Sequence, residues 1–173
     1  MKFYSIIFCA LLLVSCGASV AVDYDKKIDF STYNSYDFYS SIDSGLSELD
    51  DKRIMQITDS LLQIKGMVRS DVPQLYINFF ASENISASRN TLGIGIGSSG
   101  GNVGIGVSGG IPIGGRVVNQ QLTLDFIDAQ KDDLVWQAVA EGEMKERATP
   151  QQKEEYYISV LEKILKKYPP RKK

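Results

Sequence analysis

The stretch TLGIGIGSSGGNVGIGVSGG, residues 91–110, restricts the fold of this chain more than any other feature because so much of it is glycine. Glycine is unfavourable inside helices, and Pro112 and Gly114 follow with no helical pattern. Two glycine triplets in this stretch match the spelling of a dinucleotide-binding fingerprint, but that fingerprint has to open a helix. A lysine directly after the last glycine, which a Walker loop needs, is also missing. The sequence therefore disfavours a phosphate-binding loop here.

A β-hairpin explains the same stretch better. With Ser99-Gly100 as a two-residue turn, Leu92 lies opposite Val107 and all aliphatic side chains fall on one face. The opposite face is almost bare backbone and consists of Gly93, Gly95, Gly97, Gly104 and Gly106. The hairpin either covers an edge of the core or lets another backbone approach closely, so these glycines are a candidate interaction surface.

The first residues resemble a bacterial lipoprotein signal peptide, which we assign to residues 1–15. Lys2 precedes an apolar run that is far too short to span a bilayer, and Leu13-Val14-Ser15-Cys16 matches a lipobox. The resemblance implies that Cys16 becomes the lipid-attachment site and the new N-terminus, which would tie the protein to a membrane. The alternative is an ordinary secretory signal in which Cys16 has no such role.

Residues 16–22 are predicted to be a lipidated tether that holds the domain close to a membrane. Gly17 follows the cysteine, where an aspartate would indicate retention in the inner membrane, so we expect an outer-membrane protein that faces the periplasm. After processing, the chain would have no free cysteine, and it has no histidine anywhere. This composition excludes histidine and cysteine catalysis and metal sites built from them, and we expect no cofactor and no bound metal.

Charge gives further limits on the possible partners. The formal net charge of the chain is -2, with acidic and basic residues interspersed along it. Binding of nucleic acid would need a basic stripe, and none is present, so we expect no nucleic-acid partner. Adjacent carboxylates occur at Asp50-Asp51 and Asp132-Asp133, where a helix N-terminus and a hairpin turn explain them without catalysis.

The remaining pattern predicts a single domain over residues 23–170, with the hairpin inserted at 91–115 and a basic tail at 171–173. Apolar residues at 54, 57, 61 and 64 predict a helix from about Glu48 to Lys65 that Gly66 ends. A capping box at Thr149–Gln152 begins a second helix, which Pro169-Pro170 ends. Strands are expected near residues 33–39, 75–80, 122–127 and 134–140, and we expect Trp136 to be a core residue.

Several motifs together resemble one known family. They are Asp23-Tyr-Asp25, the aromatic series Phe30-Ser31-x-Tyr33-x-x-Tyr36-x-Phe38, the glycine-rich middle, Leu134-Val-Trp136 and the final Tyr168-Pro-Pro170. They are similar to the bacterial envelope lipoproteins grouped as domain of unknown function 4136. The resemblance implies a lipid-anchored α+β domain and brings no catalytic residues.

From this pattern we expect an α+β fold, a two-layer sandwich whose mostly antiparallel sheet carries two helices on one face and the inserted glycine-rich β-hairpin. The first functional hypothesis is a lipid-anchored, non-enzymatic binding or scaffolding module that contacts another envelope protein. A ligand-binding or transport-accessory lipoprotein is second, and a carboxylate-based hydrolase is third.

Overall fold

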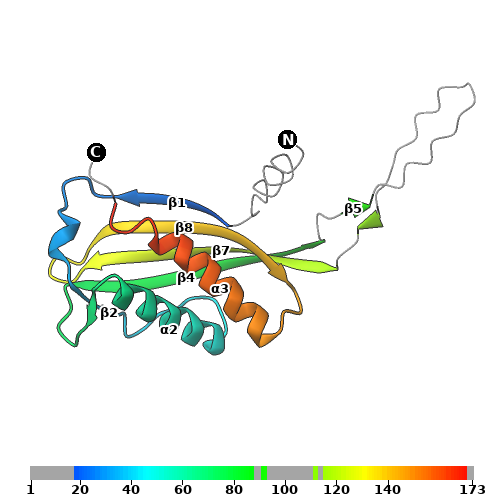
Figure 1. Cartoon of the computed structure of the whole chain (residues 1–173), viewed down its shortest axis with the longest axis horizontal. Helices are drawn as coiled ribbons and strands as arrows, with labels where there is room; N and C mark the ends of the chain where they lie inside the picture. Colours follow the sequence, from blue (N-terminus) through cyan, green and yellow to red (C-terminus); the bar gives the residue numbers. More distant parts are fainter. Residues whose placement is uncertain (1–17, 88–90, 93–110, 113–114, 171–173) are drawn as a thin grey trace, which may run out of the picture.

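The computed structural model describes residues 18–87, 91–92, 111–112 and 115–170, which form an α+β fold (Figure 1). The α+β class predicted from the sequence is therefore confirmed. The strands are β1 (Ser19–Tyr24), β2 (Ser35–Phe38), β3 (Val68–Arg69), β4 (Leu75–Ala87), β5 (Thr91–Leu92), β6 (Ile111–Pro112), β7 (Arg116–Asp128) and β8 (Asp133–Lys145). The helices are α2 (Glu48–Ile64) and α3 (Pro150–Leu165), with a short 3-10 turn η1 at Phe30–Thr32.

The main sheet has six strands in the order β1-β8-β7-β4-β2-β3, and β5 and β6 form a separate pair. The ladders β1–β8, β8–β7 and β7–β4 are antiparallel. The short strand β2 pairs in parallel with both β3 and β4, so the sheet is mixed. The parallel pairs arise because α2 returns the chain to the end of the sheet where β2 began.

Both helices lie on the same side of the sheet in Figure 1, and the core lies between them and the strands. Buried side chains alternate along β2 and along the first part of β4, as expected when one face is buried. In the central strand β7, by contrast, all residues from Leu122 to Phe126 are buried. Trp136 is 0% exposed, which confirms its predicted place in the core. Its ring packs against Phe126 and Tyr168, with ring centroids 4.9 Å and 5.3 Å away.

The first strand corrects the predicted tether at residues 16–22. Ser19 to Tyr24 pair with Glu141 to Trp136 of β8 along the outer edge of the sheet. Val20, Val22 and Tyr24 are partly buried against the core, which explains why this segment is a strand. The domain therefore includes Ser19 and lies several residues further toward the N-terminus than the predicted start at Asp23.

The hairpin formed by β4 and β7 is longer than the sequence pattern predicted. Residues 75–87 pair with 128–116 without a break, and the same offset continues from β5 to β6. Leu92 therefore lies opposite Ile111, and the predicted partner Val107 is wrong. The buried face of the long β4–β7 ladder fixes its register, and the β5–β6 pair continues the same register. The prediction had placed the pairing from a local two-residue turn instead.

The helix ends agree with the sequence signals. Ser47 caps α2, Gly66 follows it with a φ of 84°, and Thr149 and Gln152 form the predicted capping box of α3. Ile64 is one of the apolar residues from which the helix was predicted, but it does not lie on the buried face, because its side chain is 81% exposed. The buried positions of α2 instead recur every four residues, at Asp50, Ile54, Thr58 and Leu62.

Candidate functional site

The best candidate for a functional site is a groove beside α3, where the sheet extends past the helix. Its volume is about 1200 Å³ and it is open to solvent. The far ends of β4, β7 and β8 form one wall, and the outward side of α3 forms the other. Most of its lining side chains are amides, hydroxyls or carboxylates, including Asn84, Gln121, Glu143, Gln152 and Ser159. Such a surface can hydrogen-bond a polar ligand or another polypeptide.

Two buried polar atoms lie among the residues that line this groove. Gln120, which is 1% exposed, donates through Nε2 to Glu83 at 2.7 Å and to Tyr157 Oη at 3.2 Å. Its Oε1 has no hydrogen-bond partner among the described residues, and neither does Tyr156 Oη. Exchanging the amide oxygen and nitrogen of Gln120 would place an oxygen against the Glu83 carboxylate. The exchange would therefore not give the Gln120 side chain a complete set of hydrogen bonds.

Gly142 makes room for the Tyr156 side chain. A Cβ at this position would lie 2.7 Å from Tyr156 Oη and 2.9 Å from its Cε2. Burial, with a contribution from the Glu83 charge, raises the pKa of Tyr156 to about 12. The hydroxyl therefore stays protonated at neutral pH and is available as a hydrogen-bond donor.

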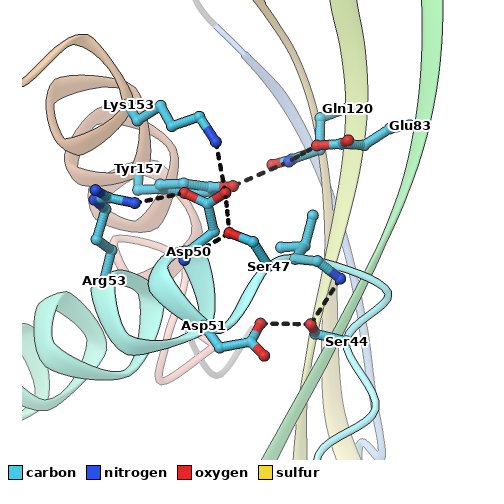
Figure 2. A network of polar contacts seen from close by, with 10 residues as sticks. Ser44, Ser47, Asp50, Asp51, Arg53, Glu83, Gln120, Lys153 and Tyr157 are labelled. Carbon is cyan, nitrogen blue, oxygen red and sulfur yellow. Dashed lines mark hydrogen bonds and ion pairs between the residues drawn. The ribbon is translucent and has the colours of Figure 1, made fainter. Parts of the chain in front are cut away.

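The Asp50 carboxylate, close to this groove, connects the two helices. It accepts hydrogen bonds from Ser47 Oγ at 2.8 Å, Arg53 NH1 at 2.8 Å and Lys153 Nζ at 2.6 Å (Figure 2). Burial acts to raise the pKa of Asp50, but the hydrogen bonds from Lys153, Ser47 and Arg53 outweigh it and hold the pKa below its usual value. Asp50 is thus an ionised structural centre that fixes the start of α3 on the start of α2.

The adjacent carboxylate has a separate role. Asp51 accepts a hydrogen bond from the Ser44 hydroxyl, and Ser44 Oγ in turn accepts from the Leu46 backbone N–H (Figure 2). Asp50 and Asp51 therefore bind different partners and do not face each other. This arrangement agrees with the interpretation of the pair as part of a helix N-terminus. The two carboxylates do not form an acid–base dyad.

The opposite end of the sheet is closed by tyrosine–aspartate hydrogen bonds. Tyr33 donates to Asp128 at 2.7 Å, and Tyr39 donates to Asp132 at 2.7 Å. The bond from Tyr33 lowers the pKa of Asp128. Asp132 lies in the turn between β7 and β8 with a φ of 57°, as the turn interpretation of Asp132-Asp133 predicts.

The site residues predicted from the sequence lie outside the described residues. This applies to Cys16 and to the glycines of the candidate interaction surface, Gly93, Gly95, Gly97, Gly104 and Gly106. Within residues 18–87, 91–92, 111–112 and 115–170, no group of three or more His, Cys, Asp or Glu side chains is placed to hold a metal ion. In the same ranges, no helix is both long and apolar enough to span a membrane.

Neither the groove nor the interhelical ion pair is contained in a local sequence pattern. Asp50 and Lys153 are far apart in the chain, and only packing of α2 against α3 brings them together. A signal for Asp50 was nevertheless present, because it lies four residues before Ile54 on the buried side of α2. For Gln120, its place among the alternating side chains of β7 indicates an inward orientation.

Solved structures share this fold at low sequence identity. A PDZ domain protein from Parabacteroides distasonis matches with a TM-score of 0.55 and 17% identity, over 99% of this chain and 41% of that one. This chain thus spans less than half the length of that protein. The PelC dodecamer from Paraburkholderia phytofirmans matches with a TM-score of 0.51 and 14% identity, over 86% of this chain and 95% of that one.

No curated protein matches the sequence. The family model described as "Domain of unknown function (DUF4136)" matches residues 20–170, which is nearly all of the described domain. This match covers β1 from Val20 onward, the helices α2 and α3, and the strands β4, β7 and β8. The chain therefore belongs to the DUF4136 family.

Proposed function

We propose that this protein is a lipid-anchored protein of the cell envelope with a non-enzymatic binding or scaffolding role. The Leu13-Val14-Ser15-Cys16 pattern supports the anchor, and Cys16 is the residue that would carry the lipid. With Gly17 after the cysteine, the outer membrane, on its periplasmic side, is the proposed location. One protein with this fold, PelC, is described as a dodecamer, so a scaffold made of several copies is compatible with the fold.

The observation that carries this proposal is the position of β1. Its first residue, Ser19, is held in the sheet opposite Glu141 and lies only three positions after Cys16. Three extended residues span at most about 10 Å, so a lipid on Cys16 would hold this end of the sheet against the membrane surface. Ala18 and Ser19 also line the groove, which would therefore open close to the membrane.

A ligand-binding role is the second candidate function, and the groove supports it. Buried polar groups without partners cost free energy, and a polar ligand or a bound water could satisfy them. Gln120 Oε1 offers an acceptor and Tyr156 Oη a donor among the lining residues. A small polar ligand would have to donate a hydrogen bond to Gln120 Oε1 and accept one from Tyr156 Oη.

The test uses intact cells that are supplied with a fatty-acid analogue suitable for labelling. The wild-type chain should incorporate the label and Cys16→Ser should not, because the acyl chains attach to that sulfur and to the amine that cleavage before Cys16 exposes. In the same cells, a photoreactive residue at Glu143 in the groove should capture a discrete envelope component.

Two matched controls accompany this experiment. Cys9→Ser removes the other cysteine and should leave labelling unchanged. A photoreactive residue at Lys52, an exposed position on α2 outside the groove, should capture nothing. Labelling of Cys16→Ser equal to that of the wild type would refute the anchor, and equal adducts from Glu143 and Lys52 would refute the groove as a binding surface.

A further inference from the structure

The outer edge of β4 is paired over only part of its length. Leu75 to Ile77 pair with β2, and the Ala81 N–H donates to the Ser44 carbonyl at 2.8 Å. Beyond Ala81, the described residues place no strand on this edge, although β7 pairs with β4 on its other side as far as Ala87. Among the residues that the structure describes, the strand segment from Ser82 to Ala87 therefore has no partner on this edge.

The backbone groups on this free edge belong to alternate residues. The Ile77 carbonyl accepts from the Tyr39 N–H at 3.0 Å, and the Ala81 N–H also points away from β7. Because a strand repeats every two residues, Glu83, Ile85 and Ala87 present their N–H and C=O groups on the same side. These three residues offer six main-chain hydrogen-bonding groups to an added strand.

This edge has few of the features that usually prevent strand addition. Residues 78–87 read NFFASENISA and contain no lysine and no proline, and Glu83 is the single charged residue. Ile85 is 45% exposed on this segment. Natural proteins commonly protect free edges with lysine, proline or a covering element, so an unprotected edge is a site for pairing with another strand.

We propose that two copies of this chain pair through this edge, with Glu83–Ala87 antiparallel to the same segment of the second copy. The segment is self-complementary when Ile85 lies opposite Ile85 of the second copy. Glu83 then lies opposite Ala87, and all six outward backbone groups find partners. The proposal does not rest on the lipid anchor, since the same edge is present with or without it.

Other registers of the two strands are less favourable. A pairing centred on Glu83 would place two carboxylates opposite each other, which is destabilising in a sheet. A pairing centred on Asn84 would place Ala87 opposite Ala81, whose N–H is already bonded to Ser44. The register centred on Ile85 avoids both problems and buries its exposed side chain against its own copy.

The test is disulfide formation in the full-length protein, in cells, under mild oxidation. Residues at the centre of such a pair have Cα atoms about 5.5 Å apart, which is within the range of a disulfide. Ile85→Cys should therefore give a species of twice the chain mass that disappears on reduction. Phe80→Cys is the matched control, because Phe80 lies on the same strand and is 44% exposed but lies outside the proposed pair.

A second measurement removes the dependence on thiol chemistry. Native mass spectrometry of the detergent-extracted wild type should show a dimer, which Ile85→Lys should abolish by placing two ammonium groups opposite each other. Phe80→Lys should leave the dimer in place. A monomeric wild type, a dimer that persists in Ile85→Lys, or equal cross-linking of the two cysteine variants would overturn the proposal and assign any assembly to another surface.

Discussion

At the scale of single residues, Asp50 has the clearest energetic role. Its side chain is 5% exposed yet ionised, and the Lys153 ammonium 2.6 Å away comes from the other helix. Desolvation of a buried charge is costly unless the charge is paired and fully hydrogen-bonded, and here three side chains supply that compensation. The pair therefore couples the stability of α2 and α3 and also makes it dependent on pH.

We expect Asp50→Asn to lower the free energy of unfolding by about 2–4 kcal/mol at pH 7, because it leaves the Lys153 charge without its partner. The folded-state pKa of Asp50 lies below its unfolded value of about 3.9, so the stabilisation is complete above that pH and is lost as the pH falls through the folded-state pKa. The difference in the free energy of unfolding between the wild type and Asp50→Asn should therefore become smaller in acid. Urea denaturation at pH 7 and pH 3, monitored by Trp136 fluorescence, measures this difference.

The control for this prediction is Lys153→Met, alone and combined with Asp50→Asn. If the ion pair causes the loss, the double variant should be less destabilised than the sum of the two single variants. A gap between wild type and Asp50→Asn that stays constant from pH 7 to pH 3 would show that the charge of Asp50 is not the reason for its effect.

At the scale of elements, α3 depends on its capping box. Thr149 Oγ1 accepts from the Gln152 N–H at 3.3 Å, and Gln152 Oε1 accepts from the Thr149 N–H at 3.0 Å. Thr149→Ala should lower the free energy of unfolding by about 1 kcal/mol, whereas Thr149→Ser, which keeps the hydroxyl, should cost much less. Chemical denaturation of the two variants checks this, and an equal loss in both would mean that the methyl group of Thr149 matters and the cap does not.

Some helices and strands could be predicted from the sequence, and others could not. The ends of α2 and α3 were predictable because capping residues and glycine act locally. β1 was missed although Val20, Val22 and Tyr24 alternate, because the predicted lipid anchor favoured a tether there. The parallel pairing of β2 and the hydrogen bonds of Asp50 depend on residues distant in the chain, and no local pattern contains them.

At the scale of the whole molecule, the two ends of the sheet differ. One end is held by the Tyr33–Asp128 and Tyr39–Asp132 hydrogen bonds and by packing of Tyr168 on Phe126 at 4.6 Å. At the other end, β4, β7 and β8 extend past the helices (Figure 1). The groove and the free edge of β4 lie beside these strand ends. The first end is thus closed by side-chain contacts, whereas the strand ends beside the groove are available for contacts with a partner.

This division predicts that residues 93–110 can be removed without unfolding the domain. Leu92 and Ile111 lie opposite each other, so an Asn-Gly turn can replace the segment and keep the register of the β4–β7 ladder. Because loop length changes closure entropy only slowly, the free energy of unfolding should stay within about 1 kcal/mol of the wild type. Urea denaturation of both chains measures the difference. A loss of more than about 3 kcal/mol, the size expected when core packing is removed, would mean that the glycine-rich segment packs on the domain and is not a separable contact element.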